Sequence, residues 1–85
     1  MKHFATSKFW DQLATLPDHV QEQARKNFEI LKSDPAHPSL HFKRIGQFRS
    51  ARVNLNYRAL GVDDGDNVVW FWIGDHKAYE RLIKG

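Results

Sequence analysis

The spacing of apolar residues changes once along the chain, near residue 40, and this change restricts the possible folds more than any other feature. Before it, apolar side chains recur every three or four residues, as in amphipathic helices. After it, they alternate with polar side chains, as in strands, and Gly, Asn and Asp separate the segments. No repeat or linker divides the 85 residues, a length near the lower limit for a stable single core. The sequence therefore predicts one α+β domain over residues 1–85.

Two helices are predicted in the first half of the chain. Residues 7–15 have apolar side chains at helical spacing, with a hydroxyl side chain available to cap the N-terminus. The next helix has Pro17 in its first turn and ends before Pro35, because a residue that precedes proline avoids helical backbone. Its apolar stripe consists of Leu16, Val20, Ala24, Phe28 and Leu31. We expect the two helices to pack as a hairpin.

The second half predicts a meander of short strands. They are expected at residues 40–45, 48–53, 57–62 and 67–73. The connections are short and rich in turn-forming residues, so neighbouring strands form antiparallel hairpins. The last strand is apolar on both faces, which is typical of a central or doubly covered strand, and a short helix follows over residues 75–83. The predicted fold is an N-terminal helical hairpin packed on a twisted antiparallel sheet of three to four strands, with a short C-terminal helix.

Positive charge is concentrated in the middle of the chain. The protein has 13 basic and 10 acidic residues, but the segment between Asp34 and Asp63 has no carboxylate. Its basic residues are Lys43, Arg44, Arg49, Arg52 and Arg58. This distribution predicts one cationic face that attracts phosphate backbones, acidic proteins or anionic membranes, the alternative being a solubilising stripe.

Two arginines of this segment are predicted to lie opposite each other. A three-residue turn at 54–56 pairs Arg52 with Arg58 and directs both away from the core, an arrangement that like-charge repulsion disfavours. Guanidinium groups bind phosphate oxygens bidentately, so the pair is a candidate phosphodiester clamp, with Lys43 close enough to contribute. The alternative is two solvated arginines that point apart.

The same register, continued across the acidic turn, pairs Arg58 with Trp72. An indole beside a guanidinium is typical of surfaces that stack unpaired bases. The alternative is that this strand is simply buried, which we expect for Trp70 and Phe71.

His76 and Tyr79 share one face of the terminal helix, and both side chains can transfer protons. Cleavage of RNA by its own 2′-hydroxyl needs a base, an acid and cations around the phosphorane, but no metal or other cofactor. The alternative is that His76 is a capping or solvent-facing residue. His37 and His41 are four residues apart in non-helical chain, which gives little support for a metal pair.

The absence of cysteine and of any long apolar run bears on location. The chain has no segment of the ~20 apolar residues that a membrane span needs. Its start lacks the apolar region and cleavage site of a signal peptide. We therefore expect a mature protein in a reducing, cytoplasmic environment.

The second half carries three motifs that together resemble a known family. They are His37-Pro38-Ser39-Leu40-His41-Phe42-Lys43, then Arg52-Val53 with Asn56-Tyr57-Arg58-Ala59-Leu60-Gly61, then Trp70-Phe71-Trp72-Ile73-Gly74 with His76 and Tyr79. This pattern resembles the RelE/ParE toxin superfamily, and it is most similar to the small ParE-like toxins of type II toxin–antitoxin modules. The resemblance spans nearly the whole chain. It implies a helical hairpin on an antiparallel sheet, and a cognate antitoxin that covers the basic face.

The resemblance also implies two possible activities. RelE-like members cleave mRNA in the ribosomal A site, with basic residues on the sheet and a C-terminal histidine or tyrosine that transfers protons. ParE-like members inhibit DNA gyrase without a nuclease site. The presence of His76 and Tyr79 favours a metal-independent mRNA endoribonuclease that inhibits translation. In this interpretation Arg58, His76 and Tyr79 are the catalytic residues. The residues predicted to bind RNA are Lys43, Arg44, Arg49, Arg52 and Trp72. The alternatives are a gyrase inhibitor and an inactive antitoxin-binding module.

Overall fold

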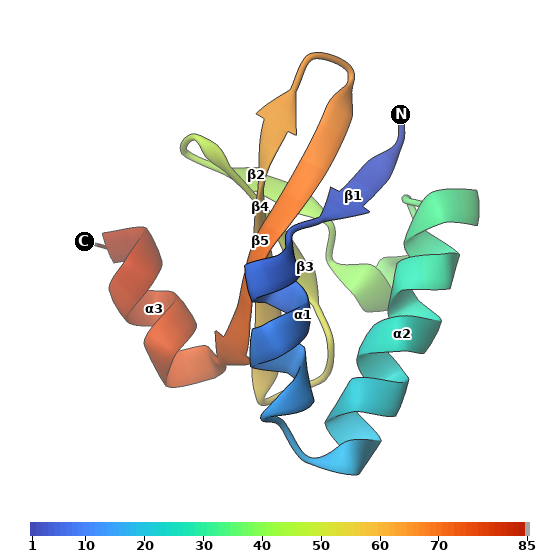
Figure 1. The fold of residues 1–85 in the computed structure, drawn as a ribbon. Coiled ribbons are helices and arrows are strands. Elements are labelled where there is room, and N and C mark those ends of the chain that lie inside the picture. The colour runs from blue at the N-terminus through green and yellow to red at the C-terminus, as the bar shows by residue number, and fades with distance from the viewer. Residues whose placement is uncertain (85) are drawn as a thin grey trace.

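The computed structural model describes residues 1–84. Five strands form one sheet, and three α-helices lie on its two faces (Figure 1). In chain order the elements are β1 (His3–Ala5), α1 (Ser7–Ala14), α2 (Asp18–Ser33), the 3-10 helix η1 (Pro38–Leu40), β2 (Lys43–Ile45), β3 (Phe48–Arg52), β4 (Tyr57–Asp64), β5 (Asn67–Asp75) and α3 (His76–Lys84). None of the helices within residues 1–84 combines the length and apolar content needed to cross a membrane.

The sheet has the strand order β1-β5-β4-β3-β2, and strands β2 to β5 form the predicted antiparallel meander. The prediction of a wholly antiparallel sheet with three to four strands was wrong, because β1 adds a parallel edge strand beside β5. A three-residue strand is too short to show a hydrophobic period. With β1 in place β5 is an interior strand, as its apolar residues on both faces predicted.

Helices α1 and α2 cover one face of the sheet, which we call the hairpin face (Figure 1). Thr6 caps α1 by accepting a hydrogen bond from the backbone of Phe9 (3.1 Å), as the sequence predicted. Asn27 fixes α2 to the sheet, because its amide donates to the carbonyls of Arg52 and Val53. The buried core between the layers consists of Phe9, Leu13, Leu31, Leu40, Ala51, Ala59, Val68, Trp70 and Ile73.

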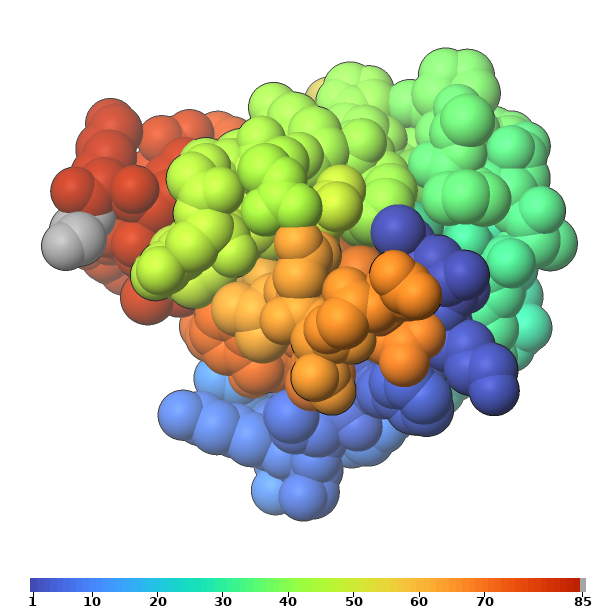
Figure 2. All heavy atoms as spheres, turned by 90° about the horizontal axis from the view of Figure 1, so that it is seen from above, coloured from blue at the N-terminus to red at the C-terminus, as the bar shows by residue number. Residues whose placement is uncertain are grey.

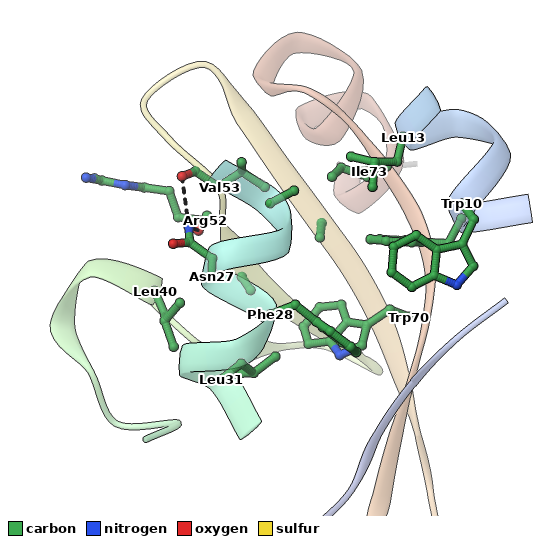
Figure 3. A pocket seen from close by; sticks show the side chains of 14 residues that line it. Trp10, Leu13, Asn27, Phe28, Leu31, Leu40, Arg52, Val53, Trp70 and Ile73 are labelled. Carbon is green, nitrogen blue, oxygen red and sulfur yellow. Dashed lines mark hydrogen bonds between the residues drawn. The ribbon is translucent and has the colours of Figure 1, made fainter. Parts of the chain in front are cut away.

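Figure 3 shows a small apolar pocket where side chains of α1 and α2 meet the sheet, with Trp10 at one side and Asn27 at the other. The pocket encloses about 40 Å³. This is far below the roughly 300–1,000 Å³ of pockets that hold small-molecule ligands. The pocket is therefore an imperfection of core packing, and substrate binding has to be sought on the outer surfaces.

Helix α3 lies on the opposite face of the sheet, which we call the α3 face (Figure 1). Tyr79 from α3 is only 3% exposed, and its hydroxyl hydrogen-bonds to the buried Ser50 hydroxyl at 2.9 Å. Leu60 is 1% exposed and is directly opposite Ser50 in the β3–β4 pairing. The sheet is thus covered on both faces, with α3 placed against the strands that carry the predicted arginine pair.

The register between β3 and β4 is the predicted one, with Arg52 opposite Arg58 and Ala51 opposite Ala59. The predicted register between β4 and β5 was wrong. The pairing already differs by one residue at the turn, where Val62 lies opposite Val69 and not opposite Val68. A bulge between Leu60 and Gly61 adds a second residue, so that Arg58 lies opposite Gly74 and not opposite Trp72. Bulges insert a residue into one strand without a distinct sequence signature, so uniform alternation could not locate this one.

The segment predicted as a strand at 40–45 is shorter in the structure. Pro38 stands in the first turn of η1, which occupies 38–40, and β2 begins only at Lys43. Between them His41 adopts a left-handed backbone conformation (φ 45°, ψ 41°), which non-glycine residues seldom adopt.

Candidate functional site

The five central cations are divided between the two faces of the sheet. Successive residues of a strand point to opposite faces, and directly paired residues point to the same face. Lys43 is paired with Ser50, and Arg52 with Arg58, so these three cations share the α3 face with Tyr79. Arg44 and Arg49 are paired with each other and belong to the opposite face. The prediction of a single face that carries all five cations was therefore wrong.

Arg44 and Arg49 are both paired with one carboxylate, which leaves one net positive charge on the group. Asp63 accepts hydrogen bonds from the Arg44 guanidinium and from Arg49 Nε, the latter at 2.9 Å. Hydrogen bonds from Arg44 and Arg49 hold the pKa of Asp63 below its ordinary value of 3.8. Figure 2 views this end of the molecule, where the tip of the β4–β5 hairpin lies between the β2–β3 hairpin and the N-terminal segment. These three residues, the Asp63 cluster, hold two hairpins together.

Lys43, Arg52 and Arg58, which we call the open cations, form no ion pair with any residue in 1–84. Nε and Nη1 of Arg58 are buried and have no hydrogen-bond partner among the described residues. Its guanidinium lies 5.5 Å from the centre of the Tyr79 ring. A buried guanidinium without acceptors is costly, and an anion that reaches these nitrogens would remove that cost.

His76, at the start of α3, packs on the same tyrosine ring. Its ring stacks on Tyr79 at 5.8 Å, so Tyr79 contacts both His76 and Arg58. His76 Nε2 is 3.1 Å from a carboxylate oxygen of Glu80, while Nδ1 is buried and unpartnered within residues 1–84. The backbone of His76 donates to the Asn56 carbonyl at 2.8 Å, which ties the start of α3 to the turn between Arg52 and Arg58.

Trp72 lies on the same face of the sheet as the arginine pair, at a different register from the predicted one. It lies opposite Leu60, on the α3 face. Its indole covers Gly74, and a Cβ atom built on Gly74 would lie 2.5 Å from Trp72 Cζ2. Because Gly74 is the direct partner of Arg58, a glycine at position 74 lets the indole extend toward the guanidinium.

His41 belongs to this neighbourhood although the sequence analysis gave it no role. Partial desolvation, and then the positive charges of Arg52, Arg58 and Lys43, lower the pKa of His41 below its ordinary value of 6.5. A signal for this placement existed in the sequence. Where Lys43 is paired with Ser50, His41 and Arg52 each lie two residues beyond that pair at the same end of the two antiparallel strands. The candidate site therefore comprises His41, Lys43, Arg52, Arg58, Trp72, His76 and Tyr79, whereas Arg44 and Arg49 lie elsewhere.

A family model for the ParE-like toxin domain matches residues 18–81, which include every residue of this candidate site. The chain belongs to the ParE-like toxin domain family. This confirms the resemblance predicted from the motifs of the second half. No curated protein matches the chain in sequence.

Several solved structures with the same fold are described as toxins or toxin–antitoxin complexes. A chain of the RelB–RelE antitoxin–toxin complex from Methanococcus jannaschii is 17% identical with a TM-score of 0.72, over 93% of this chain and 96% of that one. For the RelBE2 complex of Mycobacterium tuberculosis the identity is 20% and the TM-score 0.66, with 88% and 96% covered. The YoeB/ParE toxin from Agrobacterium tumefaciens is 15% identical, with a TM-score of 0.66 and coverage of 89% and 99%. At these identities the matches establish the fold.

Proposed function

We propose that this protein is the toxin of a type II toxin–antitoxin module and that it cleaves mRNA on the ribosome. The observation that carries the proposal is the set of buried, unpartnered nitrogens on Arg58 and His76, which lie around one tyrosine ring. A phosphodiester supplies the oxygen acceptors that these nitrogens lack. The family match to a toxin domain is consistent with this proposal.

The reaction is an in-line attack of the RNA's own 2′-hydroxyl on the adjacent phosphorus. The bond from the 2′-oxygen to phosphorus forms as the bond from phosphorus to the 5′-oxygen breaks. The 2′-proton passes to a base, and a proton from an acid passes to the leaving 5′-oxygen. The products are a 2′,3′-cyclic phosphate and a 5′-hydroxyl, so neither metal nor cofactor is consumed.

Each residue of the site has a role in this proposal. Arg52 and Arg58 bind the scissile phosphate and stabilise the extra negative charge of the phosphorane, and Lys43 adds to the positive field. His76 is the general acid. Its Nε2 faces Glu80, which leaves the buried Nδ1 to donate to the 5′-oxygen.

Two aromatic residues complete the proposed site. The hydroxyl of Tyr79 is occupied by Ser50 in a buried position, so we assign Tyr79 to positioning His76 and Arg58. Trp72 offers a stacking surface for a base next to the phosphate. Arg44 and Arg49, which were predicted to be among the RNA-binding residues, contribute only long-range attraction because they lie on the other face and are paired with Asp63.

We also propose an antitoxin partner in the cytoplasm. The structures from M. jannaschii and M. tuberculosis are of toxin–antitoxin complexes. An acidic segment of such a partner would neutralise the open cations and block access to His76. The assembly would then be a hetero-oligomer of toxin and antitoxin.

A second candidate function is inhibition of DNA gyrase without catalysis, which the ParE-like family match favours.

Induced expression of the chain alone distinguishes mRNA cleavage from gyrase inhibition. Growth is followed, and the 5′ ends of cellular RNA are mapped in the same cultures. We expect growth arrest with new cuts inside translated messages, both of which are lost in His76→Ala. His19→Ala is the matched control, because His19 is an exposed histidine on α2. Arrest with intact messages would contradict cleavage and support gyrase, and the absence of arrest would indicate an inactive antitoxin-binding module.

A further inference from the structure

His41 is held in an unusual backbone conformation next to the candidate site. It ends η1 in the left-handed region (φ 45°, ψ 41°), and its backbone N–H donates to the Pro38 carbonyl. This conformation is strained for residues other than glycine, and such strain is concentrated at functional positions. The imidazole itself is exposed to solvent.

The strand pairs place two arginines side by side on the α3 face. Arg52 lies opposite Arg58, and Arg58 lies opposite Gly74, two residues before His76. His41 and Arg52 each lie two residues beyond the Lys43–Ser50 pair, at the same end of the antiparallel strands β2 and β3. We call Arg52 and Arg58 the arginine row; His41 is at its β2 end and His76 is at its β5 end.

The groups that act on His41 from the neighbouring strands are cationic. They are Lys43 from β2, Arg52 from β3 and Arg58 from β4, and together with desolvation they lower the pKa of His41. The nearby His37 is engaged differently, because its Nδ1 lies 3.2 Å from the backbone nitrogen and 2.8 Å from the hydroxyl of Ser39. His41 is therefore mostly neutral at pH 7, with a lone pair available to accept a proton.

We infer that His41 is the general base of the cleavage reaction, at the opposite end of the arginine row from the acid His76. This inference rests on the proposed function. In-line displacement at phosphorus places the attacking and leaving oxygens on opposite sides of the transferred group, so base and acid must approach from opposite directions. His41 takes the proton of the 2′-hydroxyl as the 2′-oxygen bonds to phosphorus. His76 gives its proton to the 5′-oxygen as that bond breaks, and exchange with water restores both residues.

The test compares three purified proteins in single-turnover cleavage of a defined message on programmed ribosomes from pH 5 to pH 9. The variant His41→Asn removes the imidazole but keeps a residue that tolerates left-handed backbone. His37→Asn is the matched control, because asparagine can also cap η1. Thermal melts establish that all three are folded to the same extent.

We expect His41→Asn to cleave at least about 100-fold more slowly than the parent, the scale of general-base catalysis. We also expect it to lose the acidic limb of the pH–rate profile, while His37→Asn keeps the parent's rate and profile. If the parent cleaves and His41→Asn stays within threefold of it with the acidic limb intact, the inference is wrong and the proposed function stands. If the parent does not cleave, the proposed function and this inference both fail.

A second measurement does not depend on turnover. Proton NMR titration of the His41 ring should give a pKa below 6.5, and Arg52→Gln should raise it because one of the cations that act on the ring is removed. Failure of Arg52→Gln to move that pKa would show that His41 is not at the end of the arginine row.

Discussion

The two sets of cations in the middle of this chain differ in the face of the sheet on which they lie and in whether a carboxylate is paired with them. Arg44 and Arg49 lie on the hairpin face and share one carboxylate, Asp63. Arg52 and Arg58 lie on the α3 face, and two guanidinium nitrogens of Arg58 are buried without an acceptor in residues 1–84. The first set stabilises the contact between two hairpins. The second set combines like-charge repulsion with buried nitrogens that have no acceptor, as expected of a site that binds an anion.

This difference shows that charge density along a sequence does not identify a binding surface. Alternation of side chains sends neighbouring cations to opposite faces. Whether a cation is available then depends on a carboxylate distant in sequence, here Asp63. The proposed function is therefore tested best by substituting one arginine from each set and comparing the two cleavage rates.

The largest expected effect is the contrast between Arg58→Gln and Arg44→Gln. Arg58→Gln should lower the single-turnover cleavage rate by about 10²–10³-fold, the usual loss when one donor to the transition-state charge is removed. Arg44→Gln should change it by less than about threefold, because surface ion pairs contribute little. Equal losses in the two variants would show that the open cations have no special role.

Gly74→Ala sharpens the contrast within the site. The added Cβ would lie 2.5 Å from the Trp72 indole and would displace it from its position over Gly74, the strand partner of Arg58. We expect a stability loss of about 1–3 kcal/mol in denaturant unfolding and cleavage slower by roughly tenfold, since one stacked base contributes about 1–3 kcal/mol. If Gly74→Ala and Trp72→Ala both cleave at the parent's rate, Trp72 makes no contact with RNA.

Tyr79→Phe distinguishes positioning from proton transfer. Loss of the buried hydroxyl leaves the Ser50 hydroxyl without its partner, so the free energy of unfolding should fall by about 1–2 kcal/mol. The aromatic ring that contacts Arg58 and His76 remains, and cleavage should fall by less than about tenfold. A loss of a hundredfold or more, with the protein still folded, would instead make the Tyr79 hydroxyl a proton donor.

Asp63→Asn should produce the smallest effect. The pKa of Asp63 is lower in the folded protein than its ordinary value of 3.8, so its stabilising contribution is present above that value. The contribution is lost as the pH falls through the lower folded value. The denaturation midpoint of the parent should therefore approach that of Asp63→Asn in acid and exceed it slightly at pH 7. Identical midpoints across the whole range would mean that the Asp63 cluster does not stabilise the fold.

Much of the fold could be predicted because its signals are local. Helical spacing located α1 and α2, and the turn at 54–56 correctly paired Arg52 with Arg58. The edge strand β1 was missed because three residues show no period, and its place depends on pairing with β5, more than sixty residues away. The predicted register of β5 was wrong by one residue at the turn and by a second at the bulge beside Leu60, which nothing in the sequence marks.

The types of residue in the candidate site could be predicted from the sequence. The separation of the five cations between the two faces of the sheet could not. Residue chemistry indicated a phosphate clamp with proton-transfer groups on the last helix, and the structure brings Arg58, His76 and Tyr79 together. The separation of Arg44 and Arg49 depends on Asp63, which approaches them only once three strands are aligned. The position of His41 near the arginine pair depends on its left-handed backbone after η1. A histidine in the sequence does not predict that conformation.

An NMR titration that resolves the arginine Nε–H signals would show directly whether Arg58 binds the phosphate. The probe is a short RNA with a single 2′-deoxy nucleotide before the scissile phosphate, which binds but cannot be cleaved. We expect the Arg58 Nε–H signal to shift downfield on binding, while that of Arg49, already bonded to Asp63 at 2.9 Å, stays in place. A shift at Arg49 with none at Arg58 would show that the phosphate does not bind at Arg58.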